Sequence, residues 1–231
     1  MRQFYIPEIL KTDEKITLSA EESKHVVRVL RMKTGDKLEI LDGKGLKCIG
    51  EITDNNPKST EVRILEKKEI TPSNKHIHIA IAPTKSNDRL EWFLEKATEI
   101  GVDEISLILT ANAERKVIKL ERLEKIIVSA FKQSKRSFKP KLNALQTFSD
   151  FVKMHPEGLI AHCYENEKNS IASCLKPRNC VIIIGPEGDF SESEVSEALA
   201  QKYTPISLGE NRLRTETAGI YACTLAKVTL T

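Results

Sequence analysis

The chain has 231 residues, of which 40% are hydrophobic, 30% charged and 5% aromatic, and its formal net charge is +3. This length accommodates one large domain or two small ones with a sizeable core. The nearly neutral net charge excludes a basic electrostatic field over the whole molecule, the kind that would indicate a nucleic-acid-binding protein. Locally the balance differs, because residues 111–145 hold ten Lys and Arg against three Glu. One surface, rather than the whole molecule, is therefore expected to meet a polyanion.

Cysteine spacing and hydropathy exclude several other classes. The five cysteines are irregularly spaced and form no C-x-x-C pair, which predicts neither a disulfide framework nor a zinc site. They are Cys48, Cys163, Cys174, Cys180 and Cys223. His76 and His78 alternate on a predicted strand but lack a third ligand, so we expect no metal. Because no apolar run has the length of a membrane span and no signal peptide is present, we expect a cytoplasmic protein without a membrane partner.

Residues 1–70 predict a small β-barrel. Short apolar segments at residues 4–6, 15–18, 38–41, 46–52 and 61–65 are separated by turn signals such as Asp42-Gly43. One helix interrupts them, opened by a capping box of Ser19 and Glu22. Closely spaced strands with a single helix are typical of a small barrel.

Residues 73–231 follow a polar linker, Ile70–Lys75, and predict an α/β domain. Strands are expected at residues 77–83, 102–109, 158–163, 181–184 and 205–208. Helices are expected at residues 90–100, closed by Gly101, at 120–131, and after Gly188, where Ser191 and Glu194 form a capping box. Alternating strands and helices favour a mostly parallel sheet between helices.

Two loops that follow predicted strands predict a ligand site. Gly185-Pro-Glu-Gly188 leads into a helix but has neither Walker nor Rossmann glycine spacing. The segment 208–219 is dense in polar side chains, and Ala218 and Gly219 place small residues in the first turn of the last helix, where a backbone or flat ring could lie close. Thr215 capping that helix is the structural alternative. No triad or zinc-protease spacing supports a hydrolase.

Basic segments predict RNA contacts. His25, Arg28 and Arg31 are three residues apart and share one helix face, and Lys132-Gln-Ser-Lys-Arg136 ends a basic helix. A solvated charged surface is the alternative for both segments.

These motifs together resemble a known family. Ile184-Gly-Pro-Glu-Gly-Asp-Phe-Ser191, followed by Leu208-Gly and then Leu213-Arg-Thr-Glu-Thr-Ala218, is similar to the RsmE family of 16S rRNA uridine N3-methyltransferases in the SPOUT superfamily. The stretch from His25 to Arg31, the pair Lys85 and Lys96-Ala-Thr-Glu-Ile-Gly-Val102, and Gln133-Ser134 with Arg136 and Pro140 resemble further family motifs. Two positions depart from them: Lys132 replaces a common acid, and Asp189 replaces a frequent glycine.

The resemblance implies a SPOUT-type parallel sheet with a deep C-terminal trefoil knot behind an N-terminal PUA-like β-barrel that binds RNA. It implies S-adenosylmethionine as cofactor, a homodimer, and a uridine in the decoding region of 16S rRNA, in the 30S subunit, as substrate. The cofactor-binding residues it implies are His162, Gly185, Pro186, Glu187, Gly188, Leu208, Gly209, Leu213, Arg214, Thr217 and Ala218. The RNA-binding residues are His25, Arg28, Arg31, Lys85, Gln133, Ser134 and Arg136.

The chemistry that the resemblance implies assigns three candidate catalytic residues. Uridine N3 must lose a proton before it can attack a methyl group, and a cation beside the uracil oxygens would stabilise the resulting anion. Arg214 is the candidate cation, and Glu216 or Glu187 the candidate proton acceptor. Two other functions remain open: a SPOUT enzyme that methylates a ribose 2′-oxygen, and a non-catalytic RNA-binding factor of ribosome assembly.

Overall fold

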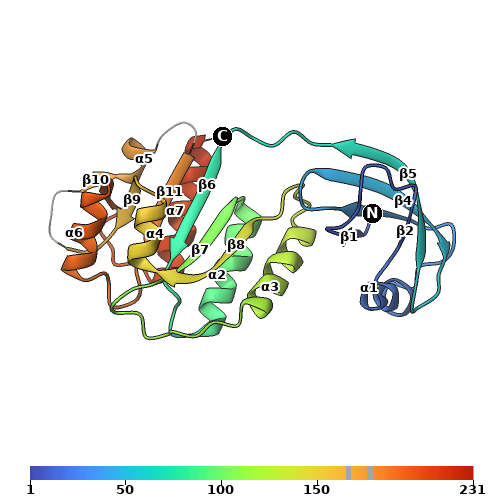
Figure 1. The fold of residues 1–231 in the computed structure, drawn as a ribbon, viewed down its shortest axis with the longest axis horizontal. Helices are drawn as coiled ribbons and strands as arrows, with labels where there is room; N and C mark the ends of the chain where they lie inside the picture. The colour runs from blue at the N-terminus through green and yellow to red at the C-terminus, as the bar shows by residue number, and fades with distance from the viewer. Residues whose placement is uncertain (165–167, 176–178, 231) are drawn as a thin grey trace. The chain divides into compact units, whose positions relative to one another are not determined.

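A computed structural model describes residues 1–164, 168–175 and 179–230, and these divide into two compact units (Figure 1). The first, the N-terminal unit, combines Met1–Pro72 with Phe131–Lys139. The second, the C-terminal unit, combines Ser73–Ala130 with the chain from Pro140 onward. The chain therefore leaves the N-terminal unit near the predicted linker and returns to it for residues 131–139. The sequence does not predict this return.

The N-terminal unit is a curled sheet of five strands. They are β1 Gln3–Tyr5, β2 Lys15–Thr17, β3 Lys37–Leu41, β4 Leu46–Asp54 and β5 Glu61–Glu69, in the order β1-β3-β4-β5-β2. Only β1 and β3 are parallel; the other pairs are antiparallel. Alternate residues of β4, among them Leu46, Cys48 and Ile52, are buried, as expected for a sheet with one covered face. The five predicted strand segments are thus confirmed.

The predicted helix of this unit changes its winding midway. Helix α1 spans Ala20–Lys24, and the Ser19 hydroxyl accepts a hydrogen bond from the amide of Glu22 at 3.3 Å, as the sequence predicts. A π-helical turn, η1, follows at His25–Val29, and Arg31 then takes a left-handed φ of 54°. Arg31 therefore lies beyond the helix, and the prediction that it shares one helix face with His25 and Arg28 is wrong. π-turns are rare and often accompany functional sites because they re-aim side chains.

Residues 131–139 complete the N-terminal unit through backbone hydrogen bonds. The Gly45 amide donates to the Ser137 carbonyl at 3.1 Å, and the Lys139 amide donates to the Gly43 carbonyl at 2.9 Å. A Cβ on Gly43 would lie 2.9 Å from the Tyr5 ring, at a φ of 72°, so this turn requires glycine.

The described residues of the C-terminal unit form a sheet of seven parallel strands. They are β6 His76–Ile81, β7 Glu104–Leu109, β8 Lys141–Thr147, β9 Gly158–Ala161, β10 Asn169–Ser170, β11 Asn179–Ile184 and β12 Tyr203–Ser207. Their order is β10-β12-β9-β11-β6-β7-β8, and every pair is parallel. The predicted parallel sheet is confirmed, although β8 and β10 were not expected.

Helices cover both faces of this sheet (Figure 1). They are α2 Asn87–Ile100, α3 Leu120–Gln133, α4 Phe148–Met154, α5 Ile171–Cys174, α6 Glu192–Ala200 and α7 Thr215–Leu230. Ile182 and Ile184 of β11 face one core, with α2, α3, α5 and α7, whereas Ile183 faces a second core, with α4 and α6. Because β11 is buried on both faces, it reads as a continuous aliphatic run. The capping box of Ser191 and Glu194 is confirmed.

His78, considered above as half of a metal pair, is a buried core residue instead. Its Nε2 lies 2.8 Å from the Ser106 hydroxyl, and its ring centroid is 4.9 Å from that of His155. Burial lowers the pKa of His78 to about 4. Nearby, burial alone would raise the pKa of Glu104, but hydrogen bonds from Asn143 and Lys141 hold it at about 2.

The buried His78 should make the stability of the C-terminal unit depend on pH. With a folded pKa of about 4 against 6.5 unfolded, the unfolded chain takes up the proton first, so stability is full above pH 6.5 and falls as the pH drops toward 4. We expect a loss of about 2 kcal/mol between pH 7 and pH 5 from this residue. In urea unfolding, His78→Gln, which keeps a polar partner for Ser106, should flatten this dependence. Parallel pH profiles for wild type and variant would contradict the assignment.

Candidate functional site

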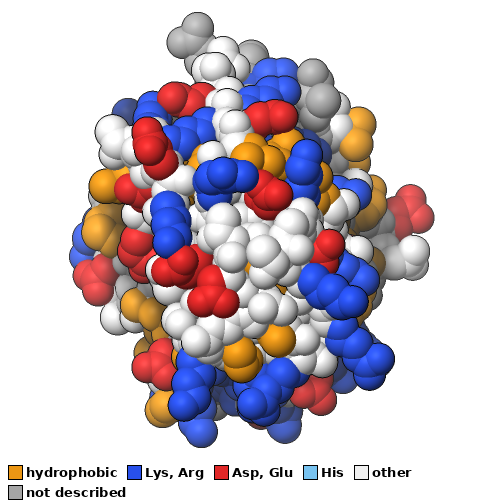
Figure 2. Space-filling model, turned by 90° about the vertical axis from the view of Figure 1, so that its right-hand side faces the viewer, with side chains coloured by type: hydrophobic (Ala, Val, Ile, Leu, Met, Phe, Trp, Pro, Cys, Tyr) orange, Lys and Arg blue, Asp and Glu red, His pale blue; other side chains and the backbone are white. Residues whose placement is uncertain are grey.

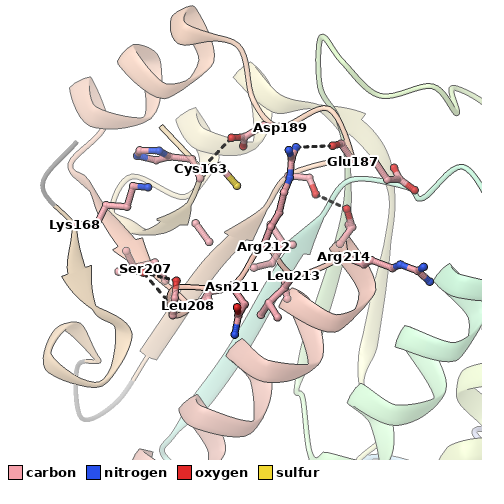
Figure 3. A pocket seen from close by; sticks show the side chains of 18 of the residues that line it. Cys163, Lys168, Glu187, Asp189, Ser207, Leu208, Asn211, Arg212, Leu213 and Arg214 are labelled. Atoms are coloured by element: carbon pink, nitrogen blue, oxygen red, sulfur yellow. Dashed lines mark hydrogen bonds between the residues drawn. The ribbon is translucent and has the colours of Figure 1, made fainter. Parts of the chain in front are cut away.

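A cavity of about 530 Å³ lies at the carboxyl ends of β9, β11 and β12 (Figure 3). In open α/β sheets this edge is where ligands bind, and the volume is that of a small-molecule site. Its walls come from three segments: residues 161–163 with Lys168, residues 184–189, and residues 206–218. The cavity thus joins both loops that the sequence singles out.

Hydrogen bonds hold the two predicted loops together. The Thr215 hydroxyl donates to the Gly185 carbonyl at 3.0 Å, which ties the first residue of α7 to the loop after β11. Thr215 therefore joins the two loops, a role beyond the helix cap considered from sequence. Between β12 and α7, the Gly209 amide donates to the Ser207 hydroxyl at 3.2 Å. Gly209 has a φ of 118° and open space beside it, so its backbone forms part of a bare wall.

The wall formed by residues 161–163 is tied to the wall formed by residues 184–189 through Asp189. This residue has a left-handed φ of 62°, and its Oδ2 accepts a hydrogen bond from the Cys163 amide at 2.8 Å. The Asn112 side chain donates to the carbonyls of Gly188 and Asp189 at 3.2 and 3.0 Å. Asp tolerates the left-handed region better than most residues, which explains how it can occupy this position.

Most of the predicted cofactor-binding residues line the cavity. They are His162, Gly185, Pro186, Glu187, Leu208, Gly209, Leu213, Arg214 and Ala218. Three further predicted residues, Gly188, Glu216 and Thr217, are adjacent in sequence but are not among the lining residues. Gly219 packs against α2: a Cβ there would lie 2.6 Å from the Phe93 ring. The ring that approaches this glycine is therefore a core phenylalanine.

The three candidate catalytic residues lie in different environments. The Arg214 side chain is exposed and extends to the side opposite Cys163 and Lys168 (Figure 3). Glu187 is half-buried, and its Oε1 accepts a hydrogen bond from the Lys85 amide at 3.1 Å. Glu216 is buried; its Oε1 lies 3.7 Å from Nε of Arg89, and its Oε2 has no hydrogen-bond partner within the part of the chain that the structure describes.

Several lining residues were not predicted as site residues from sequence. They include Cys163, Lys168, Asp189, Ser207, Asn211 and Arg212. Burial raises the pKa of the Cys163 thiol, and the Asp189 carboxylate raises it further, whereas Arg212 and Lys168 oppose these effects. Burial also lowers the pKa of His162, whose ring nitrogens have no hydrogen-bond partner among the described residues. Polarity in the segment 208–214 could have pointed to Arg212; no sequence signal marks Lys168.

The predicted RNA-binding residues fall mainly in the N-terminal unit. Glu22 links two of its segments, because its carboxylate lies 3.7 Å from Nδ1 of His25 and 3.1 Å from Nζ of Lys132. Lys132, which departs from the family pattern, therefore has an ion-pair partner on α1. Gln133, Ser134 and Arg136 belong to the returning segment 131–139 of the same unit. In Figure 2, Lys and Arg form separate groups with Asp and Glu between them.

Lys85 lies in the C-terminal unit, directly after β6. Its ammonium pairs with Glu114 at 2.9 Å, and its carbonyl accepts a hydrogen bond from Arg115.

No helix among the described residues is long and apolar enough to cross a membrane. Within the same residues, no group of three or more His, Cys, Asp and Glu side chains is arranged to hold a metal ion.

Two family models match the chain. A model described as an RNA methyltransferase domain matches residues 71–227, and one described as an RNA methyltransferase PUA domain matches residues 18–65. The ribosomal RNA small subunit methyltransferase E of Rickettsia conorii is 33% identical over 95% of this chain and 92% of its own length.

Solved structures show the same likeness. A probable rRNA-methyltransferase from Porphyromonas gingivalis is 40% identical, with a TM-score of 0.88 over 96% of this chain and 95% of that one. The ribosomal RNA small subunit methyltransferase E of Neisseria gonorrhoeae, bound to S-adenosylmethionine, is 26% identical, with a TM-score of 0.84 over 96% and 95% of the two chains. The resemblance inferred from the motifs is thereby confirmed, and the predicted cofactor is the one that this neighbour binds. The chain belongs to the ribosomal RNA small subunit methyltransferase E (RsmE) family.

Proposed function

We propose that this protein transfers a methyl group from S-adenosylmethionine to N3 of a uridine in the 16S rRNA of the small ribosomal subunit. The observation that carries the proposal is the cavity at the carboxyl ends of β9, β11 and β12, in a chain of this methyltransferase family. Its volume, its glycine-lined wall at Gly209 and its apolar residues Leu208, Leu213 and Ala218 fit an adenosine with an attached chain.

The residues around the cavity support separate roles for a cation and a carboxylate in the methyl transfer. S-adenosylmethionine supplies an activated methyl group on a cationic sulfur. We assign Arg214 to the anion that develops on the uracil oxygens, because its guanidinium is exposed at one side of the cavity. We assign proton acceptance to Glu187, which lines the cavity and has only one oxygen engaged by the Lys85 amide. Glu216, buried beside Arg89, is the alternative acceptor.

We further propose that the C-terminal unit is knotted and dimeric. A trefoil knot is supported by the position of β11, inserted between β9 and β6, and by the bond that ties α7 to the loop after β11. Helices α2 and α7 pack against each other, and both carry exposed apolar side chains, which supports a homodimer. The exposed fractions of Trp92, Tyr221 and Val228 are 44%, 43% and 72%. Surfaces of this kind mark interaction sites.

The proposal is tested by methyl transfer to small subunits taken from a strain that lacks the gene. Purified protein and labelled S-adenosylmethionine should modify one uridine, and mass spectrometry of the nucleosides should find the methyl group on the base. Methylation of the ribose would favour a 2′-O-methyltransferase instead. Failure to bind S-adenosylmethionine in calorimetry would favour a non-catalytic assembly factor.

Filling the cavity should abolish cofactor binding. Ala218 lines the cavity at a helical position, so Ala218→Trp adds bulk there without changing the backbone, and calorimetry should detect no S-adenosylmethionine binding. Gly209→Trp should have the same outcome, but its φ of 118° adds backbone strain and makes it the less clean variant. Ser193→Trp, exposed on α6, is the matched control. Unchanged affinity in Ala218→Trp would put the cofactor elsewhere.

Removing the Arg214 guanidinium should slow the chemical step more than it weakens cofactor binding. For Arg214→Ala we expect a fall of about 100-fold or more in the single-turnover rate, because a donor at the developing charge is lost. The Kd for S-adenosylmethionine should change only a few-fold, and Arg214→Lys should recover part of the rate. Equal losses of rate and affinity would reject the transition-state role.

The N-terminal unit should contribute phosphate contacts. Replacing Arg28 and Arg31 together with Gln should weaken RNA binding and reduce the slope of log K against log salt by roughly 1–2, since each lost contact removes about one counterion. Lys153→Gln with Lys202→Gln, two exposed lysines of the C-terminal unit, is the charge-matched control. A salt slope equal to that of wild type would assign Arg28 and Arg31 to a solvated surface instead.

A further inference from the structure

The cavity has a charged side that the proposed chemistry does not use. Asp189, Arg212 and Lys168 all line it, and the Oδ2 atom of Asp189 accepts a hydrogen bond from the amide of Cys163, which also lines it. In Figure 3 the Arg212 side chain extends from the loop before α7 toward Asp189 and Glu187. One acid and two bases thus gather at this side.

Asp189 is fixed in place but retains capacity to bind. Its two oxygens accept hydrogen bonds from the amides of Cys163, at 2.8 Å, and Phe190, at 2.9 Å. An ionised carboxylate has about four acceptor positions, so capacity remains for a ligand even with the Cys163 thiol also beside it. The side chain is half-buried and faces the cavity, and Asn112 anchors its backbone carbonyl at 3.0 Å. The carboxylate is therefore pre-organised to bind a cationic donor.

Arg212 offers the complementary charge. Its guanidinium makes a long contact, 3.4 Å, with the Glu187 carbonyl, and the side chain is exposed. A guanidinium has five N–H donors in a fork that matches a carboxylate, so most of its donors remain for a ligand. A carboxylate acceptor and a guanidinium donor near the same point form a charge pattern that suits a zwitterion.

The other side of the cavity differs in kind. Leu208, Leu213 and Ala218 are apolar or small, and Gly209 leaves open space. In Figure 3, Leu208 and Leu213 lie away from Asp189. A flat heterocycle fits this side and a charged group does not, because an unpaired charge there would lose its hydration. The cavity therefore has one side suited to a ring and another suited to charges.

We propose that Asp189 binds the α-ammonium group of the amino-acid part of S-adenosylmethionine, with Arg212 on the adjacent carboxylate. The inference rests on the proposed function and adds to it: Asp189 and Arg212 become specificity residues that recognise an α-amino acid attached to a nucleoside.

The competing role for Asp189 is structural, since its bond to the Cys163 amide joins two walls of the cavity. Asp189→Asn separates the two roles. Asparagine tolerates the left-handed φ and keeps an oxygen that can accept from Cys163, but it removes the charge. Asp189→Gly removes both the charge and the tie. Glu192→Gln, an exposed carboxylate three residues further on, controls for long-range electrostatics.

The test is calorimetry with three ligands on the wild-type protein and these variants. S-adenosylmethionine and S-adenosylhomocysteine both carry the amino acid, and only the first has a sulfonium charge; 5′-methylthioadenosine lacks the amino acid. For Asp189→Asn we expect affinity for the first two to fall about tenfold or more, and affinity for 5′-methylthioadenosine to stay within about twofold. Arg212→Gln should give the same pattern, and Glu192→Gln should leave all three affinities unchanged.

Three results would overturn the inference. A loss for S-adenosylmethionine alone would assign Asp189 to the sulfonium. A loss for all three ligands in Asp189→Asn would make its role structural, and no loss would remove Asp189 from recognition. In each of these cases the wild-type protein still binds S-adenosylmethionine, so the proposed function stands. A wild-type protein that does not bind S-adenosylmethionine would overturn the proposed function and this inference together.

Discussion

The insertion of β11 between β6 and β9 is the constraint on which the rest of the C-terminal unit depends. Ile182, Ile183 and Ile184 fill both cores at once, so this strand fixes the two helical layers relative to the sheet. Burial of three such side chains contributes about 5–9 kcal/mol before the cost of ordering the chain. The strand then ends at Gly185, where the loop it delivers is bonded by Thr215. The cavity thus has one wall that starts from a strand buried on both faces and another that leads into the last helix.

This arrangement separates the rigid from the adjustable parts of the site. Backbone groups of the glycine-containing loops are held by the sheet and by Thr215, whereas Arg212 and Arg214 are exposed side chains on the same short segment. They extend in different directions, Arg212 toward Asp189 and Arg214 to the opposite side (Figure 3). Two neighbouring arginines can therefore serve two ligands, the cofactor and the nucleotide.

The sequence predicted the strands that are rich in aliphatic residues and the helices with clear caps. It missed β8, whose residues Lys141–Thr147 alternate weakly, and α4, which is seven residues long and starts directly after it. Short elements with mixed polarity give little periodic signal, and the neighbouring chain decides their conformation. The returning segment 131–139 was missed for a related reason: its pairing with Gly43 and Gly45 depends on residues far away in the chain.

At the site, residue type and loop position identified most of the lining, because Gly185–Glu187 and Leu208–Gly209 follow recognisable strands. The role of each carboxylate could not be predicted. Glu216 and Glu187 look alike in sequence, yet one is buried beside Arg89 and the other lines the cavity. Glu216 is turned towards Arg89 by the packing of α7 against α2, and the sequence does not predict this packing. The contact of Asp189 with Cys163 could not be predicted either, because it depends on the meeting of two separate loops.

The returning segment has a consequence for how the chain acquires its structure during synthesis. Lys47 and Lys135, whose contact belongs to the N-terminal unit, are 88 residues apart in the chain. Domains generally fold in order as they emerge from the ribosome, but here the first unit lacks one of its pieces until much of the second has been translated. Closing so long a loop slows folding, so the five-stranded sheet must persist unfinished on the nascent chain. A fragment cut at the linker would inherit the same incomplete state permanently.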